Sequence, residues 1–202
     1  MVQTIRKGRS PIVKGSKPMT ADLRALRQPV WDSDIVLAAG SARLEFYSNR
    51  RQFITGAVKG EADTNMTDDG SLGDPAEMDV FGITFYIRPT NVAGTIADNW
   101  LIYSGFCDFI MNRTTNLGKS RLDRIPTGVA PTGFSNIAGT VLFANGMPSE
   151  NEFWNICDQN RDSRHLGRGE TFRMIAQWVP AILPSVNTTV MFFLKGLLYS
   201  PM

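Results

Sequence analysis

The chain has 202 residues, a formal net charge of +2 and 43% hydrophobic residues, and it contains two cysteines and a single histidine. This length and apolar content predict one large domain with a substantial core and exclude a disordered chain. One histidine excludes a metal site built from three histidines, and two cysteines cannot form a disulfide framework.

The first 28 residues differ in charge from the rest of the chain. They contain seven basic residues and one acid, whereas residues 29–202 contain 14 basic and 18 acidic residues. The net charge is therefore +6 on the first segment and −4 on the remainder. Such basic blocks are typical of solubilising tails or of tails that contact phosphate, anionic lipid or protein. The basic residues of this segment are Arg6, Lys7, Arg9, Lys14, Lys17, Arg24 and Arg27.

Residues 1–28 are expected to form a partly extended arm. Up to about residue 19 the segment has no periodic apolar face, which predicts an extended or mobile chain. Thr20–Gln28 predicts a short helix, because Thr20 is a suitable N-cap and Pro29 would end the helix. The apolar runs of the arm are too short for a secretory signal. Its expected role is contact with nucleic acid, membrane or a neighbouring subunit, and a solubilising tail is the alternative.

From about Val30 onward the pattern is that of β-strands. Arg43–Tyr47 alternates apolar and polar residues, as a half-buried strand does, and Gln52–Val58 is a second, shorter candidate. Asp79–Arg88 alternates over its whole length. Its expected core face comprises Phe81, Ile83, Phe85 and Ile87.

The second half of the chain continues the β pattern after one helical segment. Ile96–Phe106 is predicted to be a short helix. Further strands are predicted at Phe106–Thr114, Gly139–Phe143, Phe153–Cys157, Phe172–Val179 and Thr188–Tyr199. About eight strands with long polar loops, and no strand–helix alternation, predict a β-sandwich of the jelly-roll type. We assign residues 29–202 to this single domain and residues 1–28 to the arm.

Catalytic motifs are largely missing from the sequence. There is no phosphate-binding glycine loop, dinucleotide fingerprint or nucleophile-elbow motif. The single histidine, His165, follows a run of charged and turn-forming residues and is predicted to be an exposed loop side chain. Cys107 and Cys157 are predicted to be buried free thiols, with one disulfide as the alternative. The sequence therefore predicts no enzymatic activity, no cofactor and no metal site.

An acidic segment, Glu61–Asp79, holds seven acids and no basic residue. Its first acids resemble a calcium-binding loop, but Asp68 stands where the turn requires glycine and Asp74 where the loop requires glutamate. The alternatives are a solvated loop, a weak cation loop, or a surface that contacts basic groups of another copy of the chain. The candidate residues for the last two are Asp63, Asp68, Asp69 and Asp74.

Several segments resemble small jelly-roll capsid proteins of icosahedral bacterial viruses. These segments are Leu44–Tyr47, Glu61–Met66, Phe81–Ile87, Arg121–Gly128, Gly169–Phe172 and Leu194–Pro201. The resemblance implies a virion structural protein, made in the host cytoplasm, which assembles in many copies with other virion proteins. It implies no active site. It also implies that the basic arm faces the particle interior and contacts genome, an internal membrane or neighbouring subunits.

Two other functions remain open. The first is an accessory virion protein of the same fold, such as a decoration, vertex or tail component. The second is a carbohydrate-binding or hydrolytic β-sandwich, because the paired carboxylates of glycosidases have no local sequence signature.

Overall fold

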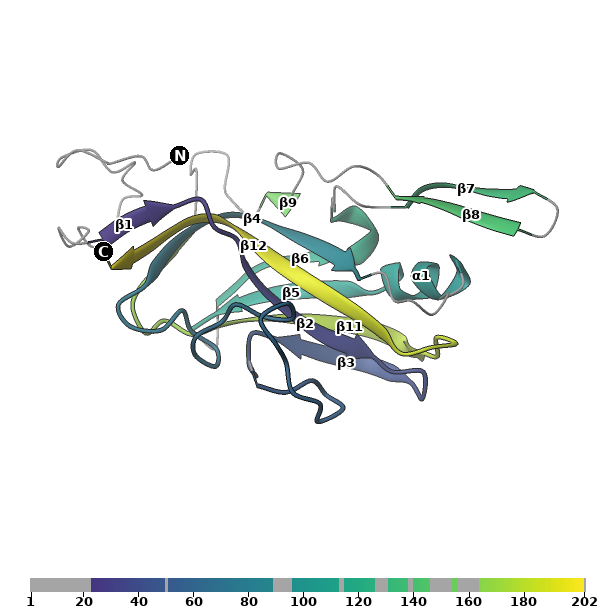
Figure 1. The fold of residues 1–202 in the computed structure, drawn as a ribbon, viewed down its shortest axis with the longest axis horizontal. Coiled ribbons are helices and arrows are strands. Elements are labelled where there is room, and N and C mark those ends of the chain that lie inside the picture. The colour runs from purple at the N-terminus through teal and green to yellow at the C-terminus, as the bar shows by residue number, and fades with distance from the viewer. Residues whose placement is uncertain are drawn as a thin grey trace.

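Two antiparallel β-sheets form the body of the molecule (Figure 1). The structure is a computed structural model that describes residues 23–49, 51–88, 96–112, 115–125, 131–137, 140–145, 154–155 and 164–201. The prediction of an all-β sandwich with one short helix is confirmed, and the helix, α1, spans Ile96–Tyr103. A 3-10 turn at Leu122–Arg124 and a hairpin of β7 (Pro131–Ile137) and β8 (Thr140–Asn145) complete the described elements.

The first sheet has six strands arranged around β12. They are β1 (Leu23–Leu26), β2 (Val30–Val36), β4 (Glu77–Ile87), β9 (Trp154–Asn155), β10 (Arg164–Leu166) and β12 (Thr188–Pro201). Strand β12 pairs with β1 and β2 along one edge and with β4 along the other. The far edge of β4 pairs with β9 and β10.

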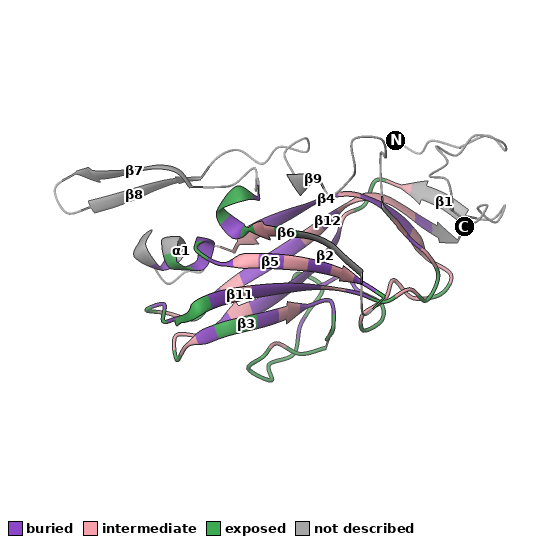
Figure 2. Ribbon diagram, turned by 180° about the vertical axis from the view of Figure 1, so that it is seen from behind, coloured by how far each residue is buried: buried purple, intermediate pink, exposed green. Residues whose placement is uncertain are grey.

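The second sheet has four strands. They are β3 (Ser41–Phe46), β5 (Phe106–Met111), β6 (Thr115–Arg121) and β11 (Phe172–Ile182), in the order β3-β11-β5-β6. The predicted inward positions of β5 and β11 are confirmed, and Figure 2 shows them as buried bands along these strands. These positions are Phe109, Met111, Phe172, Met174, Ala176 and Trp178.

Strand pairing is nested along the chain. β2 pairs with β12, β3 with β11, β4 with β10, and β5 with β6. Because the first of these strands lies in the six-stranded sheet and the next in the four-stranded sheet, the chain crosses repeatedly between the two layers. Aromatic rings fill the space between the layers: the ring centroid of Phe192 lies 4.8 Å from that of Phe46 and 4.9 Å from that of Phe85.

The helix predicted for Thr20–Gln28 is wrong over the part that is described. Leu23–Leu26 is strand β1, in which Leu26 pairs with Leu198 of β12. The pairing continues into β2 in the same antiparallel register: Val30, four residues after Leu26, pairs with Leu194, four residues before Leu198. Main-chain hydrogen bonds to a distant strand have therefore overridden the local helical preference.

Two of the seven basic residues of the arm lie within the part of the chain that the structure describes. Arg24 lies on β1 and Arg27 is exposed just after it. The other five, Arg6, Lys7, Arg9, Lys14 and Lys17, lie outside the described residues.

Two further strand predictions need correction. Gln52–Val58 forms turns closed by one isolated bridge between Gln52 and Val58, and it belongs to no named strand. In β4 the register shifts where Lys195 pairs with Gly82 and Gly196 pairs with Val80, so Phe81 is an extra residue. Because such a bulge reverses the alternation of faces, Val80 is fully buried and Phe81 only partly so.

Candidate functional site

A long connection from β3 to β4, residues 47–76, lies along the outer edge of β2. The side chain of Asn65 accepts a hydrogen bond from Trp31 N (2.7 Å) and donates one to Pro29 O (2.9 Å). Thr64 forms an isolated bridge with Asp32. This connection, which we call the edge loop, therefore satisfies main-chain groups that an edge strand would otherwise present to solvent.

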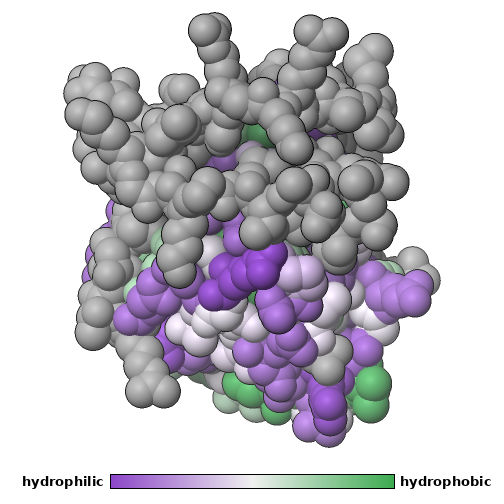
Figure 3. Space-filling model, turned by 90° about the vertical axis from the view of Figure 1, so that its left-hand side faces the viewer, coloured by the Kyte–Doolittle hydropathy of each residue, from purple (hydrophilic) through white to green (hydrophobic). Residues whose placement is uncertain are grey.

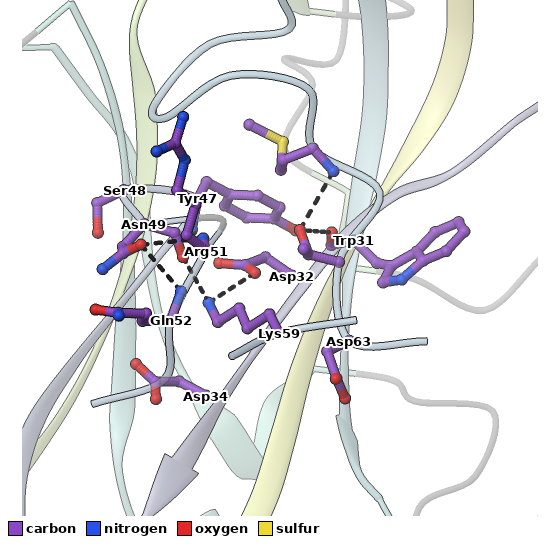
Figure 4. A network of polar contacts seen from close by, with 12 residues as sticks. Trp31, Asp32, Asp34, Tyr47, Ser48, Asn49, Arg51, Gln52, Lys59 and Asp63 are labelled. Carbon is purple, nitrogen blue, oxygen red and sulfur yellow. Dashed lines mark hydrogen bonds and ion pairs between the residues drawn. The ribbon is translucent and has the colours of Figure 1, made fainter. Parts of the chain in front are cut away.

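A buried ion pair anchors the edge loop to the sheet (Figure 4). Lys59 Nζ lies 2.9 Å from Asp32 Oδ1, and the two side chains are 1% and 0% exposed. Lys59 also donates to the carbonyl oxygen of Asn49 (2.8 Å), and Asp32 Oδ2 accepts from Tyr47 N (2.6 Å). Burial raises the pKa of Asp32, although the Lys59 charge and these hydrogen bonds oppose the effect.

Two neighbouring groups hold the start of the edge loop. Tyr47 has a positive φ of 69°, and its hydroxyl donates to Phe192 O at 2.8 Å. Asp34 Oδ1 accepts from Ile54 N at 2.9 Å and from Ile35 N at 2.8 Å. Burial raises the pKa of the Asp34 carboxyl, and it raises the pKa of the Tyr47 hydroxyl well above its usual value. The loop is therefore fixed at its start, at Ile54 and at Lys59.

At Ile54 and Val58, close to these anchors, the edge loop presents apolar side chains to solvent. Ile54 is 52% exposed and Val58 is 78% exposed. An open hollow of about 550 Å³ lies beside Val58. The residues that line it are Arg51, Gln52, Val58, Lys59, Gly60, Glu61, Thr64 and Met66. Apolar side chains held at the surface by a rigid scaffold are typical of interaction sites.

The acidic candidates do not come together as a metal site. Asp63 Oδ1 forms an ion pair with Arg88 (2.6 Å), and its second oxygen accepts from Gly60 N. Asp68 lies in a bridge with Ser71, Asp69 follows it in the same turn, and Asp74 precedes a cis proline. In the part of the chain that is described, no group of three or more His, Cys, Asp or Glu side chains is placed to hold a metal ion.

His165 is not the exposed loop residue that the sequence predicts. It lies on β10 opposite Asp79 of β4, its side chain is 20% exposed, and its Nδ1 is 2.9 Å from Asp79 Oδ1. The second oxygen of Asp79 accepts from the hydroxyl of Tyr199 at 2.6 Å. Sequence reasoning missed this cluster, because β10 has only three residues and shows no strand pattern.

The cysteine prediction is confirmed for Cys107, which is a buried free thiol on β5. Burial raises the pKa of this thiol to about 12, so it is not a reactive nucleophile at neutral pH. Cys157 lies outside the described residues.

Comparison with known proteins identifies no relative. No family model, curated protein or solved structure shows significant similarity to the chain. Among the described residues, no helix is long and apolar enough to cross a membrane.

Proposed function

We propose that the sandwich is a jelly roll. The observation that carries this proposal is the nested pairing of β2 with β12, β3 with β11, β4 with β10 and β5 with β6. A jelly roll has eight strands in two sheets wound as two Greek keys, and viral capsid proteins are one of the classes built on it.

From this fold we infer a virion structural protein: a self-assembling capsid subunit without catalytic activity. Its proposed partners are further copies of itself, other virion proteins, and genome or an internal membrane reached through the basic arm. It would be made in the host cytoplasm and reside in the virion shell. An accessory virion protein of the same fold is the alternative, and a low copy number in purified particles would favour it.

Two features of the structure support a repeating subunit. The edge loop is held by buried polar contacts and presents Ile54 and Val58 to solvent, so its contact surface is fixed before any partner binds. Strand β1 ends the first sheet beside the last residues of β12, where Leu23 pairs with Pro201. The described part of the arm therefore joins the folded body at a defined place, one end of the first sheet.

Electron microscopy of the purified full-length chain tests this function. We expect closed particles of uniform size. Replacing Ile54 and Val58 together with Asp should abolish them, because buried charges in an interface are costly. The matched control, Ile54→Val with Val58→Ile, keeps the surface apolar and should assemble. Particles that form equally well with both pairs of substitutions would exclude the edge loop from the interface, and no particles from the unaltered chain would contradict the proposed function.

A further inference from the structure

A second polar cluster joins three strands of the first sheet, remote from the edge loop's ion pair in the sequence. It contains Glu77 and Asp79 on β4, His165 on β10 and Tyr199 on β12. Arg168, which follows β10, places its Nε 3.3 Å from Glu77 Oε1. The cluster therefore connects the edge strand β10 to the centre of the sheet through side chains as well as through the backbone.

Both nitrogens of the His165 ring face carboxylates. Nδ1 lies 2.9 Å from Asp79 Oδ1, and Nε2 lies 3.6 Å from Glu77 Oε2. A carboxylate only accepts hydrogen bonds, and a neutral imidazole carries a proton on only one of its nitrogens. The neutral ring therefore leaves a lone pair facing one carboxylate, whereas the protonated ring matches both.

We propose that His165 is a pH-dependent latch, which fastens β10 to β4 when the ring is protonated and loosens this edge when the proton is lost. Among the described residues, the other attachments of β10 are few: three paired residues, the buried side chain of Leu166, and the ion pair between Arg168 and Glu77 just after the strand. A change at one side chain is thus a large part of what holds the strand. This inference does not depend on the function proposed above.

The surrounding charges act in the same direction as the geometry. The hydrogen bond with Asp79 raises the pKa of His165 above its ordinary value of 6.5, burial opposes this, and the charges of Asp79, Glu77 and Glu170 raise it further. Glu170 is itself bonded to Gly167 N and to Asn112. Since the folded pKa is the higher one, the stabilisation is complete below about pH 6.5 and is lost as the pH rises through the folded value.

The latch lies at the end of the sheet from which the arm departs. Tyr199, which binds Asp79, pairs through its backbone with Glu77 on one side and with Ala25 of β1 on the other. Two strands, β12 and β4, separate β10 from β1, and Tyr199 pairs two residues away from the row in which His165 faces Asp79. No other histidine exists in the chain, so a histidine titration reports this position alone.

Hydrogen–deuterium exchange read by mass spectrometry tests the latch on the full-length chain, whether assembled or not. Exchange of the ring C2 hydrogen gives the titration midpoint of His165, which we expect above 6.5. Amide protection over residues 164–167 should fall above this midpoint, by about tenfold for each pH unit of the elevation. Protection of β5, corrected for the intrinsic exchange rate, should not change over this range.

Three substitutions separate the latch from a merely structural histidine. Asp79→Asn should lower the midpoint most, and Glu77→Gln should lower it less while leaving the Tyr199 hydrogen bond in place. Glu45→Gln removes a carboxylate from the other sheet, where it pairs with Arg173 (3.0 Å), and should leave the midpoint unchanged. A midpoint at or below 6.5 in the unaltered chain, or protection of residues 164–167 that does not vary with pH, would overturn the proposal.

Discussion

Lys59 and Asp32 form a fully buried ion pair that joins the edge loop to β2, with 2.9 Å between Nζ and Oδ1. The other carboxylate oxygen of Asp32, Oδ2, accepts a hydrogen bond from Tyr47 N, and Lys59 Nζ also donates one to Asn49 O. Buried charges persist only when paired and hydrogen-bonded in this way. The pair therefore fixes where the edge loop meets the sheet.

Removal of Lys59 should destabilise the protein strongly. Lys59→Met keeps much of the side-chain volume but leaves the Asp32 carboxylate buried without its counter-charge, which costs about 3–5 kcal/mol. Urea unfolding monitored by tryptophan fluorescence measures the change.

The double variant Asp32→Asn with Lys59→Met provides the control for this prediction. It removes both charges, so it should recover a large part of the lost stability. If Lys59→Met unfolds at the same urea concentration as the unaltered chain, the ion pair does not anchor the edge loop.

Gly196 is required at the bulge between β12 and β4. A Cβ atom at this position would overlap the carbonyl oxygen of Asp79, a backbone atom that is fixed by strand pairing. Gly196→Ala should therefore lower the free energy of unfolding by about 3 kcal/mol. Gly60→Ala is the matched control, because its Cβ would meet nothing closer than 3.7 Å; equal thermal stability of the two variants would contradict the bulge.

Cys107 should be unreactive in the folded protein. Its thiol is buried and its pKa is raised to about 12, so almost no thiolate is present or accessible at pH 8. In a Cys157→Ser variant, a thiol-specific reagent should label no cysteine in the native state and one after unfolding in urea. Rapid labelling of the native variant would show that β5 does not have the packing described here.

Two deletions separate the arm from the fold. Removal of residues 1–19 leaves all twelve described strands intact, so the thermal unfolding temperature should not change. Removal of residues 1–28 also deletes β1 and its pairing with β12, so the unfolding temperature should fall. Equal unfolding temperatures for the two deletions would show that β1 contributes nothing to stability.

The arm should bind polyanions with a strong dependence on salt. Residues 1–19 carry five basic side chains and no acid, and each phosphate contact releases counterions. Binding to single-stranded nucleic acid should therefore weaken with a slope of up to about 3–4 in a plot of log affinity against log salt. The chain lacking residues 1–19 is the control and should not bind; binding that ignores salt would contradict this role.

The strands that the sequence predicted best have inward faces made only of apolar groups. β5 and β11 alternate cleanly, so their inward residues follow from local pattern alone. β2 was not delimited, because Asp32 and Asp34 interrupt its inward face. Their partners, Lys59 and the Ile54 amide, lie in the edge loop. The sequence around Asp32 and Asp34 contains no pattern that identifies these partners.

Apart from Gln52–Val58, which forms local turns, the errors share one physical cause, which is pairing between distant residues. β1 is a strand because of β12, whose paired residues lie more than 170 positions later. His165 faces Asp79, 86 positions away, so its burial follows from the arrangement of the sheet rather than from its own charged surroundings. The β4 bulge depends likewise on Gly196 in another strand.

Sedimentation velocity of the full-length chain over a wide concentration range tests the central claim most directly, because self-assembly is what defines a shell subunit. We predict large, discrete species that remain on dilution or reform as the concentration rises. They should be lost when Ile54 and Val58 are both replaced by Asp. A single monomeric species at every concentration, also in the presence of nucleic acid, would contradict the account.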